Sequence, residues 1–285
     1  MGTLKGSAAP SRIGIVGLGL IGTSIALSVK RGDAEIDLVG VDRDDVIRHP
    51  RIVESLSIAS TELAVIGDCE LVILATPVRA ILELLPSIEQ LAPDALVIDT
   101  GSTKRAVIGA AHAAGLSRFV GGHPMAGSEQ RGPDAARADL FDARPWFLIG
   151  DRAQTAAAGG FVQQLGATPV FMHDDGTEHD RLMAAVSHLP QVVATALMSR
   201  VGEQVGRDGL NHAGTGLRDM TRLAASEASV WESVLATNAD ALAPLLRDLA
   251  TDLQQIAGQL DDASATRRLF GIANLYRREL TGRSS

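Results

Sequence analysis

The chain has 285 residues, a formal net charge of −8 at pH 7 and a pI of about 5.4. Its length favours two domains, and its acidic balance argues against a nucleic-acid partner, because phosphate backbones are met by basic surfaces. Aromatic residues make up only 3%, too few for a surface that stacks single-stranded bases. The single cysteine, Cys69, permits no intramolecular disulfide and indicates a reducing, cytoplasmic location.

Residues 1–11 are small and polar and are predicted to form a disordered tail. The uncharged stretch Ile13–Val29 could be taken for a signal peptide or a membrane anchor. It contains several glycines, however, and Lys30 and Arg31 follow it in place of a small-residue cleavage site. We interpret it as a buried strand that leads into a buried helix, and we expect no membrane partner.

Residues 12–174 alternate short apolar runs with helical patterns. The predicted strands are Ile13–Val16, Asp37–Val41, Leu71–Ala75, Leu96–Ile98, Phe119–Gly121, Phe147–Ile149 and Val170–Met172. Several of them lack polar alternation, as do strands that are covered on both faces. Strands that alternate with helices predict an α/β domain with a doubly wound, mostly parallel sheet.

Residues 175–285 show helical periodicity and no further strand pattern. One apolar stripe comprises Leu182, Val186, Leu189, Val193, Leu197 and Val201, and a second comprises Leu242, Leu245, Leu249, Leu253, Ile256 and Leu260. Spacings of three and four residues indicate long amphipathic helices. The pattern predicts an all-helical second domain whose stripes pack within the chain or form a dimer interface.

The segment Gly17-Leu18-Gly19-Leu20-Ile21-Gly22 matches the G-x-G-x-x-G pattern directly after a predicted strand. The first glycine permits a tight turn, the second lets a pyrophosphate approach the backbone, and the third lets helix and strand pack closely. The helix N-terminus then directs its unpaired N–H groups at the phosphates. We therefore predict a Rossmann-type dinucleotide site.

Asp42 lies 20 residues beyond Gly22, at the end of the second predicted strand. An acid in this place accepts hydrogen bonds from the ribose and repels a 2′-phosphate, which favours NAD over NADP. A turn acid is the plainer interpretation, and Arg43 leaves room for NADP. Methyltransferases also place an acid here, but the strand, the three-glycine turn and the helix fit a dinucleotide better.

Two further strands end in polar or special residues at the carboxyl edge of the predicted sheet, where such sheets bind ligands. Thr76 and Pro77 follow one strand and could form a wall beside the nicotinamide or a simple turn. Ser102, in Asp99-Thr100-Gly101-Ser102-Thr103-Lys104, could cap the next helix or place its hydroxyl near the reacting group.

His123 lies in Gly121-Gly122-His123-Pro124-Met125-Ala126-Gly127-Ser128-Glu129, one strand beyond Ser102. Imidazole exchanges a proton near neutral pH, and the flanking glycines allow close approach of a ligand. The alternative is a turn histidine that hydrogen-bonds locally. Because a nicotinamide dehydrogenase needs a base for the alcohol proton, we predict that His123 is that base. Ser128 is a candidate substrate-binding residue.

In the helical region, His188 and Gln191 surround Pro190, which should kink the helix. Residues three apart share a helix face, so both side chains could point together into the cleft between the two predicted domains. Arg222 is a candidate clamp for an anionic substrate, since guanidinium binds carboxylate through two parallel hydrogen bonds. Trp231 lines the same pocket or packs in the core.

The set of motifs GLGLIGTSIAL, D-x-GS-x-K, GGHPMAGSE, SHLP and R-D-M-T-R, the last followed nine residues later by Trp231, resembles the prephenate/arogenate dehydrogenase family of tyrosine biosynthesis. The resemblance runs from about residue 12 to the final helices. It implies a Rossmann-type domain, a helical dimerisation domain and therefore a homodimer. It also implies oxidation and decarboxylation of prephenate to 4-hydroxyphenylpyruvate, or of arogenate to tyrosine.

The resemblance assigns roles to three residues. His123 would accept the proton of the ring hydroxyl while the hydride passes to the nicotinamide, and Ser102 would hydrogen-bond that hydroxyl. Arg222 would hold the ring carboxylate that is lost as carbon dioxide, and no metal would be needed.

The chain departs from the family pattern at Gln191, because many members have SHLPH where this chain has SHLPQ. A cationic histidine suits the pyruvyl carboxylate of prephenate, whereas neutral glutamine could bind either side chain, so arogenate also becomes plausible. Two other functions remain. One is a non-catalytic NAD-binding module. The other is a dehydrogenase of a different hydroxy acid, which would usually place a lysine on a helix as its acid or base.

Overall fold

The computed structural model describes residues 10–127, 130 and 132–282. Of the tail expected over residues 1–11, only Pro10 and Ser11 are described, and Ser128 lies outside the described residues. The chain divides into two compact units, with the division between Ala239 and Asp240. The first unit contains the whole sheet and the helices up to residue 239.

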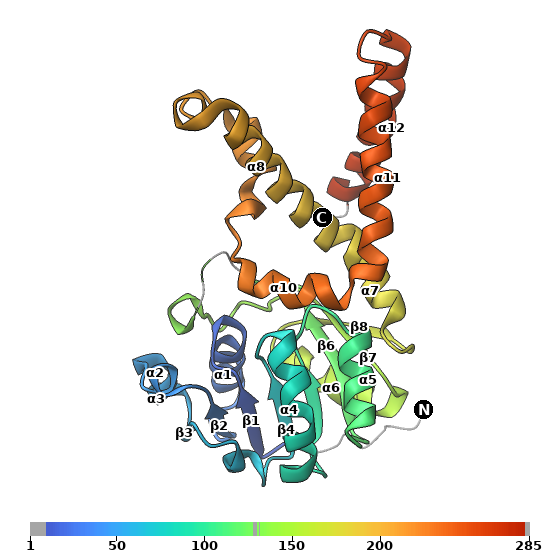
Figure 1. Cartoon of the computed structure of the whole chain (residues 1–285). Coiled ribbons are helices and arrows are strands. Elements are labelled where there is room, and N and C mark those ends of the chain that lie inside the picture. Colours follow the sequence, from blue (N-terminus) through green and yellow to red (C-terminus); the bar gives the residue numbers. More distant parts are fainter. Residues whose placement is uncertain (1–9, 128–129, 131, 283–285) are drawn as a thin grey trace. The chain divides into compact units, whose positions relative to one another are not determined.

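The first unit is built on one eight-stranded sheet of order β3-β2-β1-β4-β5-β6-β7-β8 (Figure 1). The strands are β1 (Arg12–Val16), β2 (Asp37–Val41), β3 (Ile58–Ser60), β4 (Leu71–Leu74), β5 (Leu96–Asp99), β6 (Phe119–Pro124), β7 (Pro145–Ile149) and β8 (Thr168–Met172). All neighbours are parallel except β6 and β7. The doubly wound, mostly parallel sheet is thereby confirmed, and all seven predicted strands are present.

Strand β3 is the one that the apolar pattern missed. It has only three residues at the edge of the sheet, and none of them is buried. Because a short, solvated edge strand needs no apolar run, hydrophobic periodicity does not detect it.

Helices cover both faces of the sheet (Figure 1). On one face, α1 (Leu20–Gly32) and α6 (Arg152–Gln164) contribute to a core that runs from β2 to β7. On the other face, α4 (Val78–Leu91) and α5 (Arg105–Ala113) contribute to a second core. Cys69 is buried in this second core. The short helices are α2 (Asp44–Ile47), α3 (Pro50–Ser55), and the 3₁₀ turns Leu63–Ile66 and Pro133–Ala135.

Strand β6 extends past the carboxyl end of β5. Phe119 and Val120 pair with β5, whereas Gly121 to Pro124 pair only with antiparallel β7, which places His123 opposite Phe147. A Cβ atom on Gly122 would lie 2.2 Å from the carbonyl oxygen of Asp99, so only glycine permits this close passage. His123 therefore lies on a strand that projects beyond the sheet edge, and not in a turn.

The helices after β8 begin with α7 (Thr177–Met183), a π-helical turn (Ala184–His188) and α8 (Leu189–Leu210). They continue with α9 (Thr215–Met220), the 3₁₀ turn Arg222–Ala225 and α10 (Ala228–Thr237). The π turn ends just before Pro190, which lies in the first turn of α8 where a missing N–H costs least. The expected disruption of the helix thus takes the form of a π turn followed by a new helix start.

The predicted apolar stripe of this region is only partly buried in the single chain: Leu189, Val193, Leu197 and Val201 are partly buried. Leu182 and Val186 are 42% and 56% exposed. The buried positions are Met183, Ala184, His188, Gln191 and Ala194. The π turn interrupts the α-helical register within the stripe, between Leu182 in α7 and Leu189 at the start of α8. Whether the exposed part of the stripe forms a dimer interface stays a prediction.

The second unit consists of α11, which begins at the division (Ala239–Ala257), and α12 (Ala263–Gly282). Both are helices, as predicted. In the single chain Leu253 and Leu260 of the second stripe are 56% and 76% exposed, and α12 exposes Phe270 and Tyr276 as well.

One segment, Thr177–Leu210, meets the length and composition criterion for a membrane-spanning helix, with a mean hydropathy of 1.4 in its most apolar window. Core helices of soluble proteins meet the same criterion. This segment is also divided by the π turn and by a non-helical Gly206.

Candidate functional site

The glycine loop between β1 and α1 has the geometry of a phosphate-binding turn. Gly17 has φ +98°, and a Cβ atom there would lie 2.7 Å from backbone atoms of Ala75 and Thr76. A Cβ atom on Gly22 would lie 1.8 Å from the carbonyl oxygen of Gly17, whereas nothing lies within 4 Å of one on Gly19. The first and third glycines therefore allow close packing, and the second faces open space.

The N-terminus of α1 is open to an anion. Its N-cap is Gly19, no side chain caps it, and no acidic residue lies in its first turn. The first amide N–H groups of a helix have no partner within the helix, so this end can bind a phosphate.

Asp42 stands beside the loop at the end of β2. Its Oδ2 accepts a hydrogen bond from Leu18 N at 2.6 Å, and its Oδ1 accepts one from Arg43 N at 2.7 Å. The Arg43 side chain is 78% exposed, with its Nε 3.9 Å from Asp42. The carboxylate is thus held beside the loop. The residues present fit a dinucleotide whose ribose hydroxyls donate hydrogen bonds to Asp42.

Thr76 and Pro77 follow β4 at the same edge. Pro77 is the N-cap of α4, and the hydroxyl oxygen of Thr76 is buried without a hydrogen-bond partner in the described part of the chain. A pocket of about 380 Å³ borders Pro77 between α4 and α10. A dinucleotide bound at the glycine loop would therefore extend along the sheet edge toward these two residues.

Asp99 and Lys104 form a fully buried ion pair under the sheet edge. Asp99 also accepts hydrogen bonds from Gly101 N at 2.8 Å and Gly122 N at 3.0 Å, while the Lys104 ammonium donates to Gly122 O at 2.6 Å. Burial raises the pKa of Asp99 and lowers the pKa of Lys104, and their mutual attraction opposes both shifts. The pair ties the loop after β5 to the glycines that precede His123.

Ser102 lies in the loop between β5 and α5. The N-cap of α5 is Lys104, so the capping alternative for Ser102 is wrong. No hydrogen bond of its hydroxyl is present among the described residues, and the side chain is partly exposed at the carboxyl edge. The hydroxyl is available to a ligand.

His123 is linked to a second histidine that the sequence interpretation left aside. His123 Nδ1 lies 2.9 Å from His179 Nε2, and His179 Nδ1 lies 2.9 Å from the Asp180 carboxylate. The two imidazole rings are edge to face, with centroids 5.1 Å apart. His179 and Asp180 begin the helical region, 56 residues beyond His123. Only the fold reveals this chain of three side chains.

The surroundings of His123 keep its ring neutral. Burial lowers its pKa well below 6.5, and the nearby His179, Lys104 and His188 lower it further. A neutral imidazole at physiological pH has one lone pair free for a proton, which is the state that a general base needs.

His188 is buried at the end of the π turn. Asn238 Nδ2 lies 3.1 Å from His188 Nδ1, and Trp231 packs edge to face on the ring at a centroid distance of 5.8 Å. His188 Nε2 is buried without a partner among the described residues. Burial lowers the pKa of His188 to about 4, so this ring is neutral too. Trp231 is only partly buried, and the ring that it covers is His188.

Gln191 is buried and its amide contacts the segment that begins with Arg222. Its Nε2 donates to Leu223 O at 2.8 Å, and its Oε1 accepts from Ser226 Oγ at 3.4 Å. Arg222 begins this 3₁₀ turn and is exposed. Gln191 thus positions the turn of Arg222, a structural role that the i, i+3 spacing with His188 did not indicate.

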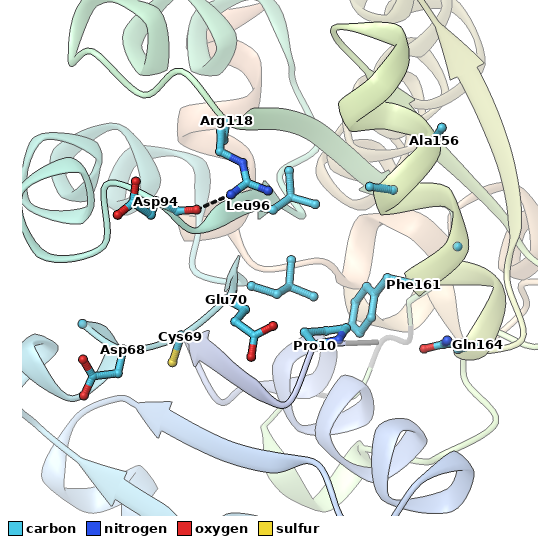
Figure 2. Close-up of a pocket in the computed structure, with 14 residues that line it drawn as sticks. Pro10, Asp68, Cys69, Glu70, Asp94, Leu96, Arg118, Ala156, Phe161 and Gln164 are labelled. Carbon is cyan, nitrogen blue, oxygen red and sulfur yellow. Dashed lines mark hydrogen bonds between the residues drawn. The ribbon is translucent and has the colours of Figure 1, made fainter. Parts of the chain in front are cut away.

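Cavity size does not identify this site. A cavity of about 620 Å³ lies at the opposite, amino edge of the sheet, where β4 and β5 begin with Leu71 and Leu96 (Figure 2). Arg118 donates to the carbonyl oxygen of Asp94 at its rim. None of the predicted site residues lines this cavity. His123, with His179, and the buried Asp99–Lys104 pair lie at the carboxyl edge instead.

Two family models match the chain. Residues 25–167 match the nucleotide-binding domain of prephenate dehydrogenase, and residues 175–271 match its dimerization domain. A prephenate dehydrogenase of Lactococcus lactis subsp. cremoris is 31% identical over 91% of this chain and 74% of its own length. A cyclohexadienyl dehydrogenase of Zymomonas mobilis is 32% identical over 86% of each chain.

Solved structures show the same architecture. Synechocystis arogenate dehydrogenase aligns with a TM-score of 0.79 and 29% identity over 94% of this chain and 99% of that one. A prephenate dehydrogenase of A. aeolicus, solved with hydroxyphenyl propionate and NAD⁺, shares the fold with a TM-score of 0.86 and 23% identity over 97% of this chain and 99% of that one. With both domain models matched and relatives above 30% identity over most of its length, the chain belongs to the prephenate dehydrogenase family.

Proposed function

We propose that the protein catalyses the NAD-dependent oxidative decarboxylation of prephenate to 4-hydroxyphenylpyruvate. The observation that supports this most is His123, a neutral imidazole on β6 at the same carboxyl edge of the sheet as the glycine loop. The experiment is to follow NADH formation by absorbance with prephenate and with arogenate. Absence of turnover with both substrates would refute the proposal.

In the proposed reaction the bound NAD supplies the acceptor for the hydride of the hydroxyl-bearing ring carbon. His123 takes the hydroxyl proton as the carbonyl character of that carbon develops, and Ser102 donates a hydrogen bond to the same oxygen. Arg222 holds the ring carboxylate until it leaves as carbon dioxide. The electron pair of the broken C–C bond makes the ring aromatic, and the protonated His123 returns its proton to the ring oxygen. The residues then have to supply positioning and one base, with no metal.

Arogenate is the second candidate substrate, because a neutral Gln191 could bind the side chain of either substrate. A neutral amide at this position lacks the positive charge that a histidine could offer to a pyruvyl carboxylate, and the structure engages it with Leu223 and Ser226. Comparison of kcat/KM for the two substrates decides between them. The partners that we propose are one of these small molecules and a second copy of the chain.

Asp42 should set the preference for NAD. Asp42→Asn keeps an oxygen for the Leu18 amide but removes the charge that repels a 2′-phosphate. We expect kcat/KM with NADP to rise relative to NAD by about tenfold or more, since like charges in contact cost several kcal/mol. Steady-state kinetics with both cofactors measures this. Asp33→Asn, which removes an exposed charge at the opposite end of α1, is the control and should leave the ratio unchanged.

Arg222 should act mainly in substrate binding. Arg222→Gln removes a charged donor of the ring carboxylate, so KM should rise by about 10- to 100-fold. Arg218→Gln, on the adjacent helix α9, is the matched control. An unchanged KM for Arg222→Gln, measured by initial rates, would exclude the clamp.

We propose that the enzyme is a cytoplasmic homodimer that assembles through its helical region, residues 175–285, with the nucleotide-binding domain over residues 12–174. The exposed apolar side chains of α11 and α12 support this, because large apolar surfaces exposed to water are typical of protein–protein interfaces. Ser128 and Trp231 complete the proposed substrate site. Sedimentation of the intact protein tests the dimer.

A further inference from the structure

The Asp180 carboxylate has a fixed direction of hydrogen bonding. Its Oδ1 lies 2.7 Å from Lys104 N, and its Oδ2 lies 3.0 Å from Arg105 N. Backbone N–H groups only donate, so the carboxylate accepts at both oxygens. Its third neighbour, His179 Nδ1 at 2.9 Å, therefore donates to it. Asp180 is 2% exposed and His179 is fully buried, which shields this arrangement from water.

The state of His179 determines the state of His123. Burial lowers the pKa of His179, so the ring is neutral and its Nε2 carries only a lone pair. The contact of 2.9 Å between His179 Nε2 and His123 Nδ1 then requires the proton to belong to His123 Nδ1. His123 Nε2 is left as the proton acceptor. The charged or titratable groups around these rings are Lys104, Asp99, Asp180 and His188.

Asn238 fixes the tautomer of His188, in the opposite sense to that of His123. Its Nδ2 lies 2.8 Å from the backbone oxygen of Asp180, which can only accept, so the orientation of the amide is unambiguous. The same Nδ2 is 3.1 Å from His188 Nδ1, which must accept as well. The proton of His188 therefore lies on Nε2, which is the buried nitrogen that has no partner among the described residues.

We propose that Asp180 and Asn238 are positioning residues that preset opposite tautomers in the site: His123 presents a proton acceptor at Nε2 and His188 presents a donor at Nε2. The tautomers follow from the contacts above, whereas the identity of the ligand rests on the proposed function. His123 would take the substrate hydroxyl proton at Nε2, while its Nδ1–H bond to His179, backed by the Asp180 carboxylate, stabilises the imidazolium that forms. His188 would donate to an oxygen of the substrate.

The first test is spectroscopic and needs no activity. In the intact protein with ¹⁵N-labelled histidine, long-range ¹H–¹⁵N correlations should show that the unprotonated nitrogen is Nε2 in His123 and Nδ1 in His188. Single replacement of each histidine assigns the signals. The opposite assignment in either ring would overturn the inference. Correct tautomers together with no turnover of prephenate or arogenate would instead reject the proposed function and leave the inference standing.

The second test changes the tautomer. An amide in place of the carboxylate in Asp180→Asn can donate to His179 Nδ1, which would place protons on His179 Nε2 and His123 Nε2 and block the base. We expect kcat to fall by about 10²- to 10⁴-fold with KM nearly unchanged, by analogy with the same change in the Ser-His-Asp triad. Asp175→Asn, on the neighbouring exposed turn, is the control. A normal kcat with an unaltered His123 tautomer would contradict the inference.

A pair of substitutions at His179 separates positioning from packing. His179→Gln can still offer an amide oxygen to His123 Nδ1, whereas His179→Leu fills the space without an acceptor. We expect the glutamine variant to retain at least about tenfold more kcat than the leucine variant, since one hydrogen bond to a charged group is worth ~1.5–3 kcal/mol. Equal losses in both, at equal thermal stability, would assign His179 a purely structural role.

Discussion

His123→Asn should lower kcat by about two to four orders of magnitude, which is the usual contribution of a general base. Asparagine keeps a polar side chain on β6 but has no group that takes up a proton near neutral pH. The glycine loop and Asp42 are untouched, so the affinity for NAD should stay the same. Initial rates of NADH formation, together with a binding titration for NAD, measure the two quantities separately.

The matched control for this change is His112→Asn, which alters an exposed histidine in the last turn of α5. It should leave kcat within about twofold, as expected for a surface change away from the site. Near-normal turnover of the His123 variant would reject His123 as the base.

The pH dependence of the unaltered enzyme follows from the same environment. Because burial lowers the pKa of His123 well below 6.5, the neutral, active ring persists through neutral pH. Protonation, and with it the loss of kcat/KM, should occur only on the acid side of pH 6.5. If kcat/KM began to fall above pH 7 as the pH is lowered, the result would contradict the lowered pKa of His123.

The strands and the glycine loop could be predicted from sequence because their signals are local. An apolar run such as Leu71–Leu74 is typical of a strand that is buried on both faces of a parallel sheet. The pattern G-x-G-x-x-G predicts the turn, the open phosphate site and the close helix–strand packing from only six consecutive residues. His123 was identified by the same kind of signal, since its flanking glycines are needed where β6 passes the backbone of Asp99.

The support of the site could not be predicted, because its contacts are long-range and geometric. His179 and Asp180 are adjacent residues in a run of acids, and nothing in their spacing indicates that one would bond His123 and the other two backbone amides of the Lys104 loop. The π turn before Pro190 had a similar effect. It interrupts the α-helical register, and His188 and Gln191, which do not belong to the predicted apolar stripe, are buried.

Lys104→Met should be the most destabilising of the substitutions considered, costing about 3–5 kcal/mol in the free energy of unfolding. Lys104 and Asp99 are both fully buried, so removal of the ammonium leaves a carboxylate without its counter-charge in the core. The loss also removes the bond to Gly122 O that fixes the strand of His123. Urea denaturation followed by circular dichroism measures the change.

The double variant Asp99→Asn with Lys104→Met shows whether this cost arises from the unpaired charge or from lost packing. If the charge dominates, the double variant should be more stable than Lys104→Met alone, because no ion remains to be buried. Recovery should be partial, since the amide has one oxygen for the two amides, Gly101 N and Gly122 N, that the carboxylate serves. Arg79→Met, which breaks the exposed pair with Glu83 on α4, is the control and should cost no more than about 0.5 kcal/mol. A double variant no more stable than Lys104→Met would mean that packing, and not the ion pair, makes Lys104 necessary, and the position of His123 would then depend on the shape of the lysine side chain.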